Sequence, residues 1–218
     1  MVFSSLFFLF IFLPLFLVLY FCLPKKCRNY VLLAFSLLFY AWGEPVYIFL
    51  MLGMTFSDYI LGRLMGRFAE DKRKRKLFLA FSIVIDLSCL GFFKYAGLVT
   101  GTVSGLFGFD IPFKGVALPI GISFFTFQTL SYTIDLYRGQ VPVEKNYAEY
   151  LMYVSMFPQL IAGPIVRYQT VKDELRNRTI KSADFFDGAI RFIYGLLKKV
   201  LLANRLGSLF DSIRAEGG

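Results

Sequence analysis

Long apolar runs separated by short charged segments dominate the chain. The first run, residues 2–23, has no charged side chain and is long enough to cross the hydrocarbon core of a bilayer, which is about 30 Å thick. It lacks the basic segment and the cleavage site of a signal peptide, so we expect it to be retained. The pattern predicts an all-α fold, a polytopic transmembrane helical bundle in a single domain, residues 1–218. The predicted spans are residues 2–23, 30–42, 45–61, 77–97, 116–137, 147–166 and 185–202.

Basic residues indicate which connections face the cytoplasm. They are concentrated in residues 25–28 and 63–76, which the positive-inside rule places inside. A solvated loop is the simplest interpretation of residues 63–76, and contact with anionic lipid is the alternative. The glycine-rich residues 98–115 are expected on the outer face.

One predicted span conflicts with this topology. If residues 147–166 crossed completely, the basic residues 167–181 would lie outside, against the positive-inside rule. Pro158, Gly163 and Pro164 interrupt the run, and irregular backbone is tolerated at membrane depth only where protein or a wet cavity surrounds it. We therefore expect a broken or re-entrant element here.

Composition supports a membrane protein. Hydrophobic residues make up 57% of the chain and charged residues 18%, whereas soluble domains have about 25% charged residues. The net charge of +9 would suit nucleic acid in a soluble protein, but no basic face with interleaved aromatics is present, so no nucleic-acid partner is expected. The bilayer is the expected partner.

Cysteine and histidine usage limits the chemistry. The cysteines are Cys22, Cys27 and Cys89, and their spacing indicates neither a disulfide framework nor a metal site. The chain has no histidine, which removes the commonest general base. Nucleotide-binding loops and nucleophile-elbow motifs are also absent from the sequence.

Ionisable residues inside predicted spans are candidates for function because burying them in a bilayer is costly. Asp58 and Lys94 lie near span ends, where their charged groups can reach water, so a structural role is favoured for both. Asp86 lies mid-span and is expected to face the protein interior, paired with a partner that the sequence does not identify.

The segment LPIGISFFTFQTLSYTIDLYRG, residues 118–139, contains a polar stripe. Five residues fall within an arc of about 140° on one helix face: Ser123, Gln128, Ser131, Asp135 and Arg138. Asp135 and Arg138 are close enough along the helix to pair. Thr126, Thr129 and Thr133 occupy a different side. The stripe predicts contact with a watered passage, and hydrogen bonding between helices explains it equally well.

The segment MFPQLIAGPIVRY, residues 156–168, is a candidate binding element. Gly163 and Pro164 free backbone polar groups, and Gln159 and Arg167 add polar side chains. Broken helices with exposed backbone donors often form binding sites in membrane proteins. Packing against small residues is the alternative interpretation.

These two segments, in this order and with FYAWGEP at residues 39–45, resemble the membrane-bound O-acyltransferase family. The resemblance is greatest to the subgroup that acetylates bacterial exopolysaccharides. It implies a many-helix fold with a central passage, in a multi-pass protein of the bacterial inner membrane. It also implies transfer of an acyl group, expected to be acetyl, from a cytosolic donor, expected to be acetyl-CoA. The acceptor would be an extracytoplasmic polysaccharide such as alginate, with polysaccharide-acetylation proteins as partners.

The family's catalytic histidine lies in its C-terminal half, so no catalytic residue is expected in this chain. We interpret the chain as the N-terminal portion of a larger enzyme, inactive without the missing half and binding no cofactor by itself. A non-catalytic transporter or assembly scaffold that reuses the fold is the alternative. The residues expected to line the passage or to be structural are Ser123, Gln128, Ser131, Asp135, Arg138, Gln159, Gly163, Pro164 and Arg167.

Overall fold

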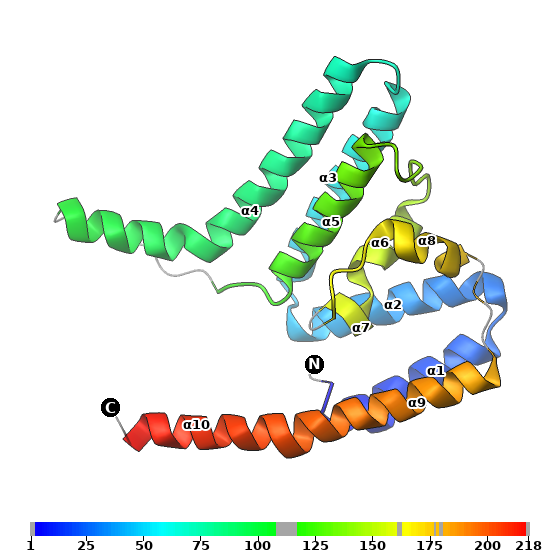
Figure 1. Ribbon diagram of the computed structural model, residues 1–218, viewed down its shortest axis with the longest axis vertical. Coiled ribbons are helices and arrows are strands. Elements are labelled where there is room, and N and C mark those ends of the chain that lie inside the picture. Colours follow the sequence, from blue (N-terminus) through cyan, green and yellow to red (C-terminus); the bar gives the residue numbers. More distant parts are fainter. Residues whose placement is uncertain (1–2, 108–116, 161–162, 177, 179–180, 217–218) are drawn as a thin grey trace.

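The computed structural model describes residues 3–107, 117–160, 163–176, 178 and 181–216 (Figure 1). Residues 2, 116, 161 and 162, which belong to predicted spans, and 108–115, which belong to the expected outer segment, lie outside this set. Within it the chain forms helices and no strand, so the predicted all-α fold is confirmed.

Phenylalanine packing joins the N-terminal helices to the middle of the chain. A π-helical segment, η1 (Phe8–Phe12), leads into α1 (Leu13–Cys22), which packs on α2 (Lys25–Gly43). Phe157, far along the sequence, contacts rings from all three segments, with ring centroids 5.3 to 6.2 Å apart. The rings packed around Phe157 are those of Phe8, Phe12, Phe16 and Phe39. Phenylalanine is thus the main component of this part of the core.

Three helices form the second part of the core: α3 (Tyr47–Arg67), α4 (Lys72–Phe107) and α5 (Ile122–Tyr137). They pack against one another side by side (Figure 1). Both α3 and α4 are long and apolar enough to cross a membrane.

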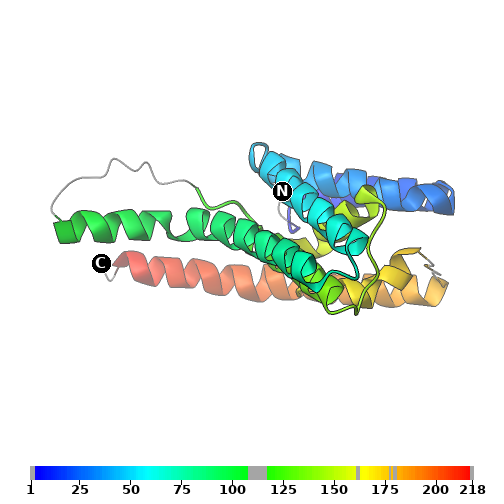
Figure 2. The same cartoon turned by 90° about the horizontal axis from the view of Figure 1, so that it is seen from above.

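Helix α4 is longer than the predicted span 77–97. It continues to Phe107, so the first part of the glycine-rich segment is helical. Each glycine lowers the stability of the helix by about 1 kcal/mol relative to alanine. This cost alone does not end a helix where no proline or capping residue is present. The Thr100 and Thr102 hydroxyls donate to the carbonyls of Ala96 (2.9 Å) and Leu98 (2.8 Å). Figures 1 and 2 show α4 bending and extending past the packed helices.

The broken element is present where the sequence predicts it. Helix α6 (Tyr147–Ser155) ends before Met156, α7 (Phe157–Leu160) is one short turn, and α8 (Tyr168–Arg176) follows. The Tyr168 hydroxyl donates to the Glu144 carboxylate (2.5 Å), which joins the residue after the element to the one before it. The chain therefore folds back on itself across the break, and residues 147–168 are called the re-entrant element below. That this element enters a bilayer stays a prediction.

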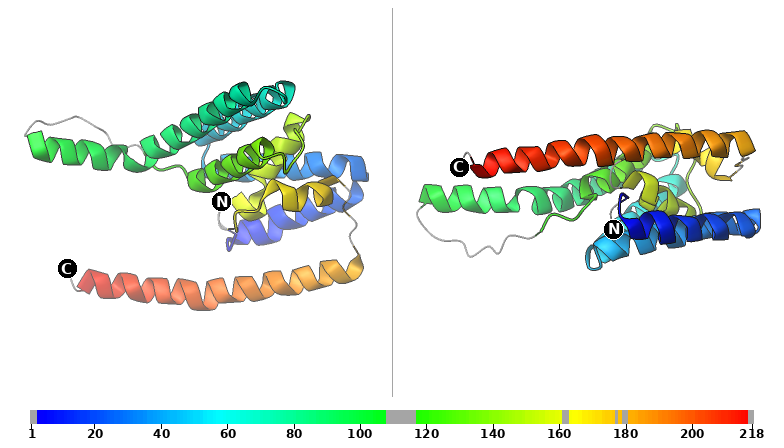
Figure 3. Two further views of the ribbon diagram at one scale, coloured as in Figure 1. Left: turned by 45° about the horizontal axis from the view of Figure 1, so that its top comes forward. Right: turned by 90° about the horizontal axis from the view of Figure 1, so that it is seen from below.

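The C-terminal part is one continuous helix. It comprises α9 (Ser182–Leu197), the π-helical η2 (Lys198–Ala203) and α10 (Asn204–Glu216), so it extends beyond the predicted span 185–202. None of its described side chains is buried, and the left view of Figure 3 shows most of it running apart from the other helices. At its start the ring of Phe185 contacts that of Phe21 on α1, with ring centroids 5.7 Å apart. Which helices cross a bilayer stays a prediction.

Candidate functional site

Two aspartates meet in the centre of the α3–α4–α5 bundle. Asp58 of α3 and Asp86 of α4 are both fully buried. The Ser82 hydroxyl donates to Asp58 Oδ1 (2.6 Å), and the Thr129 hydroxyl of α5 donates to Asp86 Oδ2 (2.9 Å). Ser82 also lies 3.4 Å from the Thr133 hydroxyl. Three helices are thus joined by one buried polar cluster.

The two carboxyl groups belong to the same cluster, because Ser82, which donates to Asp58, precedes Asp86 by one turn of α4. Asp58 Oδ2 and Asp86 Oδ1 have no donor in the described part of the chain. Carboxylates only accept hydrogen bonds, so these two oxygens need a donor that the hydroxyl groups of the cluster do not supply.

This cluster identifies the partner that the sequence left open for Asp86. The expectation for Asp58 was wrong: it does not reach water at the end of its span. Asp58 faces α4 and α5, where Ser82 satisfies one of its oxygens, and this contact replaces access to solvent.

The threonine face of α5, and not only the predicted stripe, points into the core. Thr126, Thr129 and Thr133 are fully buried. In the stripe Gln128 and Asp135 are buried, Ser123 and Ser131 are half-buried, and Arg138 is exposed. In the sequence the threonines occupy a different side from the stripe, and their spacing of three and four residues indicates a second polar face.

The expected pairing of Asp135 with Arg138 is absent: no nitrogen of Arg138 lies within 4.0 Å of the Asp135 carboxylate. Asp135 faces inward, whereas Arg138 follows the last turn of α5 and turns to solvent. Asp135 Oδ2 is buried without a donor in the part of the chain that the structure describes.

The two predicted segments converge on one backbone carbonyl. Gln128 Nε2 and Gln159 Nε2 both donate to the oxygen of Tyr153, over 3.2 and 2.8 Å. In an unbroken helix the N–H of Phe157 would bond that carbonyl, but it donates to Ser36 Oγ instead (3.2 Å). The break after α6 therefore frees a buried acceptor, and the two glutamines satisfy it.

Gly163 is fixed by close contact with the preceding turn. Its N–H donates to the Gln159 carbonyl (3.0 Å), and a Cβ at this position would lie 2.5 Å from Gln159 Cα. Pro164 and Arg167, which follow, are exposed. The structure thus brings Gly163 to Gln159 but leaves Arg167 on the surface.

Tyrosines surround the re-entrant element. The Tyr132 ring lies 4.8 Å from that of Tyr150 and 5.1 Å from that of Tyr168, which in turn lies 5.1 Å from that of Tyr153. The Tyr153 hydroxyl donates to the Val166 carbonyl (2.8 Å). These contacts hold both arms of the element against α5, and the tyrosines were not predicted as part of the site.

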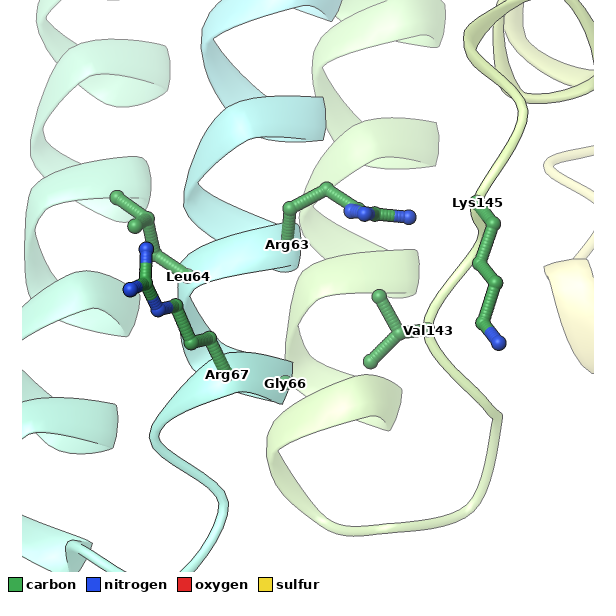
Figure 4. Close-up of a pocket in the computed structure, with 6 residues that line it drawn as sticks. All are labelled: Arg63, Leu64, Gly66, Arg67, Val143 and Lys145. Atoms are coloured by element: carbon green, nitrogen blue, oxygen red, sulfur yellow. The ribbon is translucent and has the colours of Figure 1, made fainter.

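A basic pocket of about 450 Å³ lies beside the end of α3 (Figure 4). Arg63 extends across it towards the segment that carries Val143 and Lys145, whereas the Arg67 side chain turns back beside Leu64. The residues that line it are Arg63, Leu64, Gly66, Arg67, Val143 and Lys145. The pocket therefore has three cationic side chains and no acidic one.

The basic residues of 63–76, one of the two segments predicted to face the cytoplasm, lie at the same end of the bundle as this pocket. The Arg75 guanidinium of α4 donates to the Tyr137 carbonyl at the end of α5 (2.6 Å), which brings the start of α4 to that end of the bundle. Cations at the carbonyl end of a helix are electrostatically favourable. Among the described residues, no group of three histidine, cysteine or acidic side chains is placed to hold a metal ion.

Comparison with known proteins gives close relatives. The chain is 40% identical over 216 residues to a protein of Pseudomonas aeruginosa named probable alginate O-acetylase AlgI. The matched region covers 97% of this chain and 41% of that protein. The chain is a homologue of bacterial O-acetylases. The Azotobacter vinelandii protein of the same name is 39% identical over 216 residues, which are 97% of this chain and 43% of the relative. The resemblance recognised in the sequence is confirmed.

A more distant relative of this O-acetylase homologue has another named substrate. The peptidoglycan O-acetyltransferase of Helicobacter pylori is 28% identical over 244 residues, covering 97% of this chain and 46% of that protein. No family model and no solved structure matches the chain. The chain spans less than half the length of these curated relatives.

Proposed function

We propose that this O-acetylase homologue is the N-terminal portion of a membrane-bound O-acyltransferase. The complete protein transfers an acetyl group from a cytosolic donor, acetyl-CoA, to an extracytoplasmic polysaccharide such as alginate. The observation that carries the proposal is the 40% identity to the alginate O-acetylase of Pseudomonas aeruginosa over 97% of the chain. Its location is the bacterial inner membrane, with several crossings, and polysaccharide-acetylation proteins act as its partners on the outer face.

The polar interior supports a role in positioning the reacting groups. Asp58, Asp86 and Gln128 are buried inside a bundle whose helices α3 and α4 are long enough to cross a membrane. Gln159, which is partly buried on α7, shares the Tyr153 carbonyl with Gln128. Buried polar groups in such helices are costly to maintain and commonly mark pathways or sites. In this proposal they hold the re-entrant element in place beside the acyl passage.

The chain alone is proposed to be inactive. It contains no histidine, so the histidine base implied by the family resemblance comes from the rest of the enzyme. The residues of this chain then bind and orient the reacting groups without exchanging a proton with the acceptor hydroxyl.

A chimaeric protein tests the proposal. The matching portion of the Pseudomonas aeruginosa relative is replaced by these 218 residues and expressed in a strain that lacks its own copy. The acetyl content of the secreted alginate is then measured by proton NMR. Restored acetylation supports the proposal, whereas unacetylated alginate from a chimaera that is folded and present in the membrane contradicts it.

The same strain expressing the 218 residues alone is the second arm. We expect no acetylation from it. Acetylated alginate in this arm would disprove the dependence on a histidine outside the chain. A chimaera that supports export of a small solute but no acetylation would favour a transporter instead.

A further inference from the structure

The pocket beside the end of α3 combines cationic side chains with an adjacent apolar surface. We propose that it binds the phosphate headgroup of an anionic glycerophospholipid, whose acyl chains lie along the exposed face of α3. This inference requires that α3 crosses a membrane, and it does not depend on acetyl transfer.

Within the described residues, no carboxylate forms an ion pair with the cations of the pocket. Arg63 and Arg67 stand one turn apart on α3, where like charges repel. Neither they nor Lys145 form an ion pair with any carboxylate that the structure describes, and the ion pair recorded nearby joins Lys74 to Asp71 (3.3 Å). An external anion between Arg63 and Lys145 would relieve this repulsion.

The segment that carries Lys145 is held rigidly against α3. The Tyr59 hydroxyl donates to the Lys145 carbonyl (2.6 Å), and the Lys145 N–H donates to Glu144 Oε1 (2.7 Å). The Glu144 carboxylate is itself buried, and it accepts from the N–H groups of Lys145 and Asn146 and from the Tyr168 hydroxyl. Figure 4 shows the resulting opening between Arg63 and Lys145.

The surface next to the pocket distinguishes a lipid from a soluble phosphate. Phe56 and Ile60, 51% and 41% exposed, precede Arg63 and Arg67 at steps of four, three and four residues, so all four share one face of α3. The Phe56 ring also contacts that of Tyr147 (5.4 Å), which extends the apolar surface to α6. A soluble anion would contact only the cationic side chains of this face. A lipid would contact the cations with its headgroup and the apolar side chains with its acyl chains.

The position along α3 also fits a lipid. The pocket is at the polar end of a helix long enough to cross a membrane, which is the depth of lipid headgroups. Basic pockets between transmembrane helices on the cytoplasmic side bind anionic headgroups.

Thermal unfolding of the purified membrane protein that contains this chain tests the proposal. Dioleoyl phosphatidylglycerol should raise Tm by several degrees, since a ligand that binds only the folded state stabilises it. Dioleoyl phosphatidylcholine and glycerol 1-phosphate should raise it much less. An equal rise with phosphatidylcholine, or a larger rise with glycerol 1-phosphate, would overturn the proposal.

Variants locate the effect. Arg63→Gln with Lys145→Gln should remove the response to phosphatidylglycerol, while Arg73→Gln with Lys74→Gln, which changes net charge equally on a neighbouring segment, should keep it. The same response in both double variants would overturn the proposal.

Phe56→Ser with Ile60→Ser leaves the cations intact and tests the apolar part. In the wild-type protein dioleoyl phosphatidylglycerol should raise Tm more than dihexanoyl phosphatidylglycerol does. In this variant the two lipids should raise Tm equally. If the wild-type protein responds equally to both chain lengths, the acyl contact is refuted, and this arm remains informative if the charge variants do not fold.

Discussion

Gln128 and Gln159 donate hydrogen bonds to the same oxygen atom, the carbonyl of Tyr153. They come from α5 and from the short turn α7, so their shared acceptor joins a regular helix to the broken element. The carbonyl is available only because α6 stops before Met156. A helix break and two distant glutamines therefore form one structural unit.

Removing both glutamines should destabilise the protein more than the sum of the single changes. Either amide alone still satisfies the Tyr153 carbonyl, so Gln128→Leu or Gln159→Leu should cost about 1 kcal/mol or less. The double variant leaves a buried acceptor unpaired, which should cost about 2–3 kcal/mol in total. Unfolding of the purified protein measures the coupling, with Gln140→Leu, at an exposed position, as the control. Strictly additive losses would contradict the shared role.

Position 58 should tolerate an amide but not a hydrocarbon. In Asp58→Asn the side-chain oxygen still accepts from the Ser82 hydroxyl, so we expect little change in unfolding free energy. Asp58→Leu keeps the branching of the side chain but has no acceptor, so the buried Ser82 hydroxyl loses its partner, which should cost about 2 kcal/mol or more. Thermal unfolding at fixed pH compares the two, and equal losses would argue against the bond from Ser82.

The sequence predicts the helices and the re-entrant element because their signals are local. Apolar runs give the helices, and Pro158, Gly163 and Pro164 mark the break within a few residues of where it occurs. The partner of Asp86 could not be predicted, because Thr129 lies on another helix and the contact depends on how α5 packs against α4.

The threonines of α5 illustrate a different limit. The Thr133 hydroxyl donates to the Thr129 carbonyl of its own helix (2.9 Å), and the Thr129 hydroxyl lies 2.9 Å from the Thr126 carbonyl. Because threonine can satisfy itself in this way, its presence in a span does not indicate whether it faces lipid or a polar core. Only the position of α4 shows that Thr129 also contacts a carboxylate.

Gly163→Ala should disrupt the re-entrant element. The new methyl group would meet backbone atoms of Gln159 at 2.5 to 2.9 Å, and these atoms cannot move without shifting the turn. We expect loss of acetylation by the chimaera together with faster proteolysis near Gly163. Gly188→Ala, where a Cβ meets nothing within 4 Å, is the matched control and should behave as the parent does.

Arg167→Ala should reduce acetyl transfer without changing expression or unfolding. The side chain is exposed, so its removal leaves the fold intact. Arg191→Ala, at another exposed position on α9, controls for the loss of one positive charge. Unchanged acetylation of alginate at normal expression would exclude Arg167 from the passage.

Two glycines of α3 should respond to alanine in opposite directions. A Cβ at Gly53 meets nothing within 4 Å, so Gly53→Ala should stabilise the helix by about 0.5–1 kcal/mol. At Gly66 a Cβ would lie 2.3 Å from Val143 Cγ2, so Gly66→Ala must displace the segment that carries Lys145 and should cost about 1–3 kcal/mol. The same displacement should weaken the response to phosphatidylglycerol. Measuring Tm with and without that lipid tests both effects. If Gly66→Ala is stabilised and its Tm still rises fully with the lipid, the close approach of Val143 to α3 does not shape the pocket.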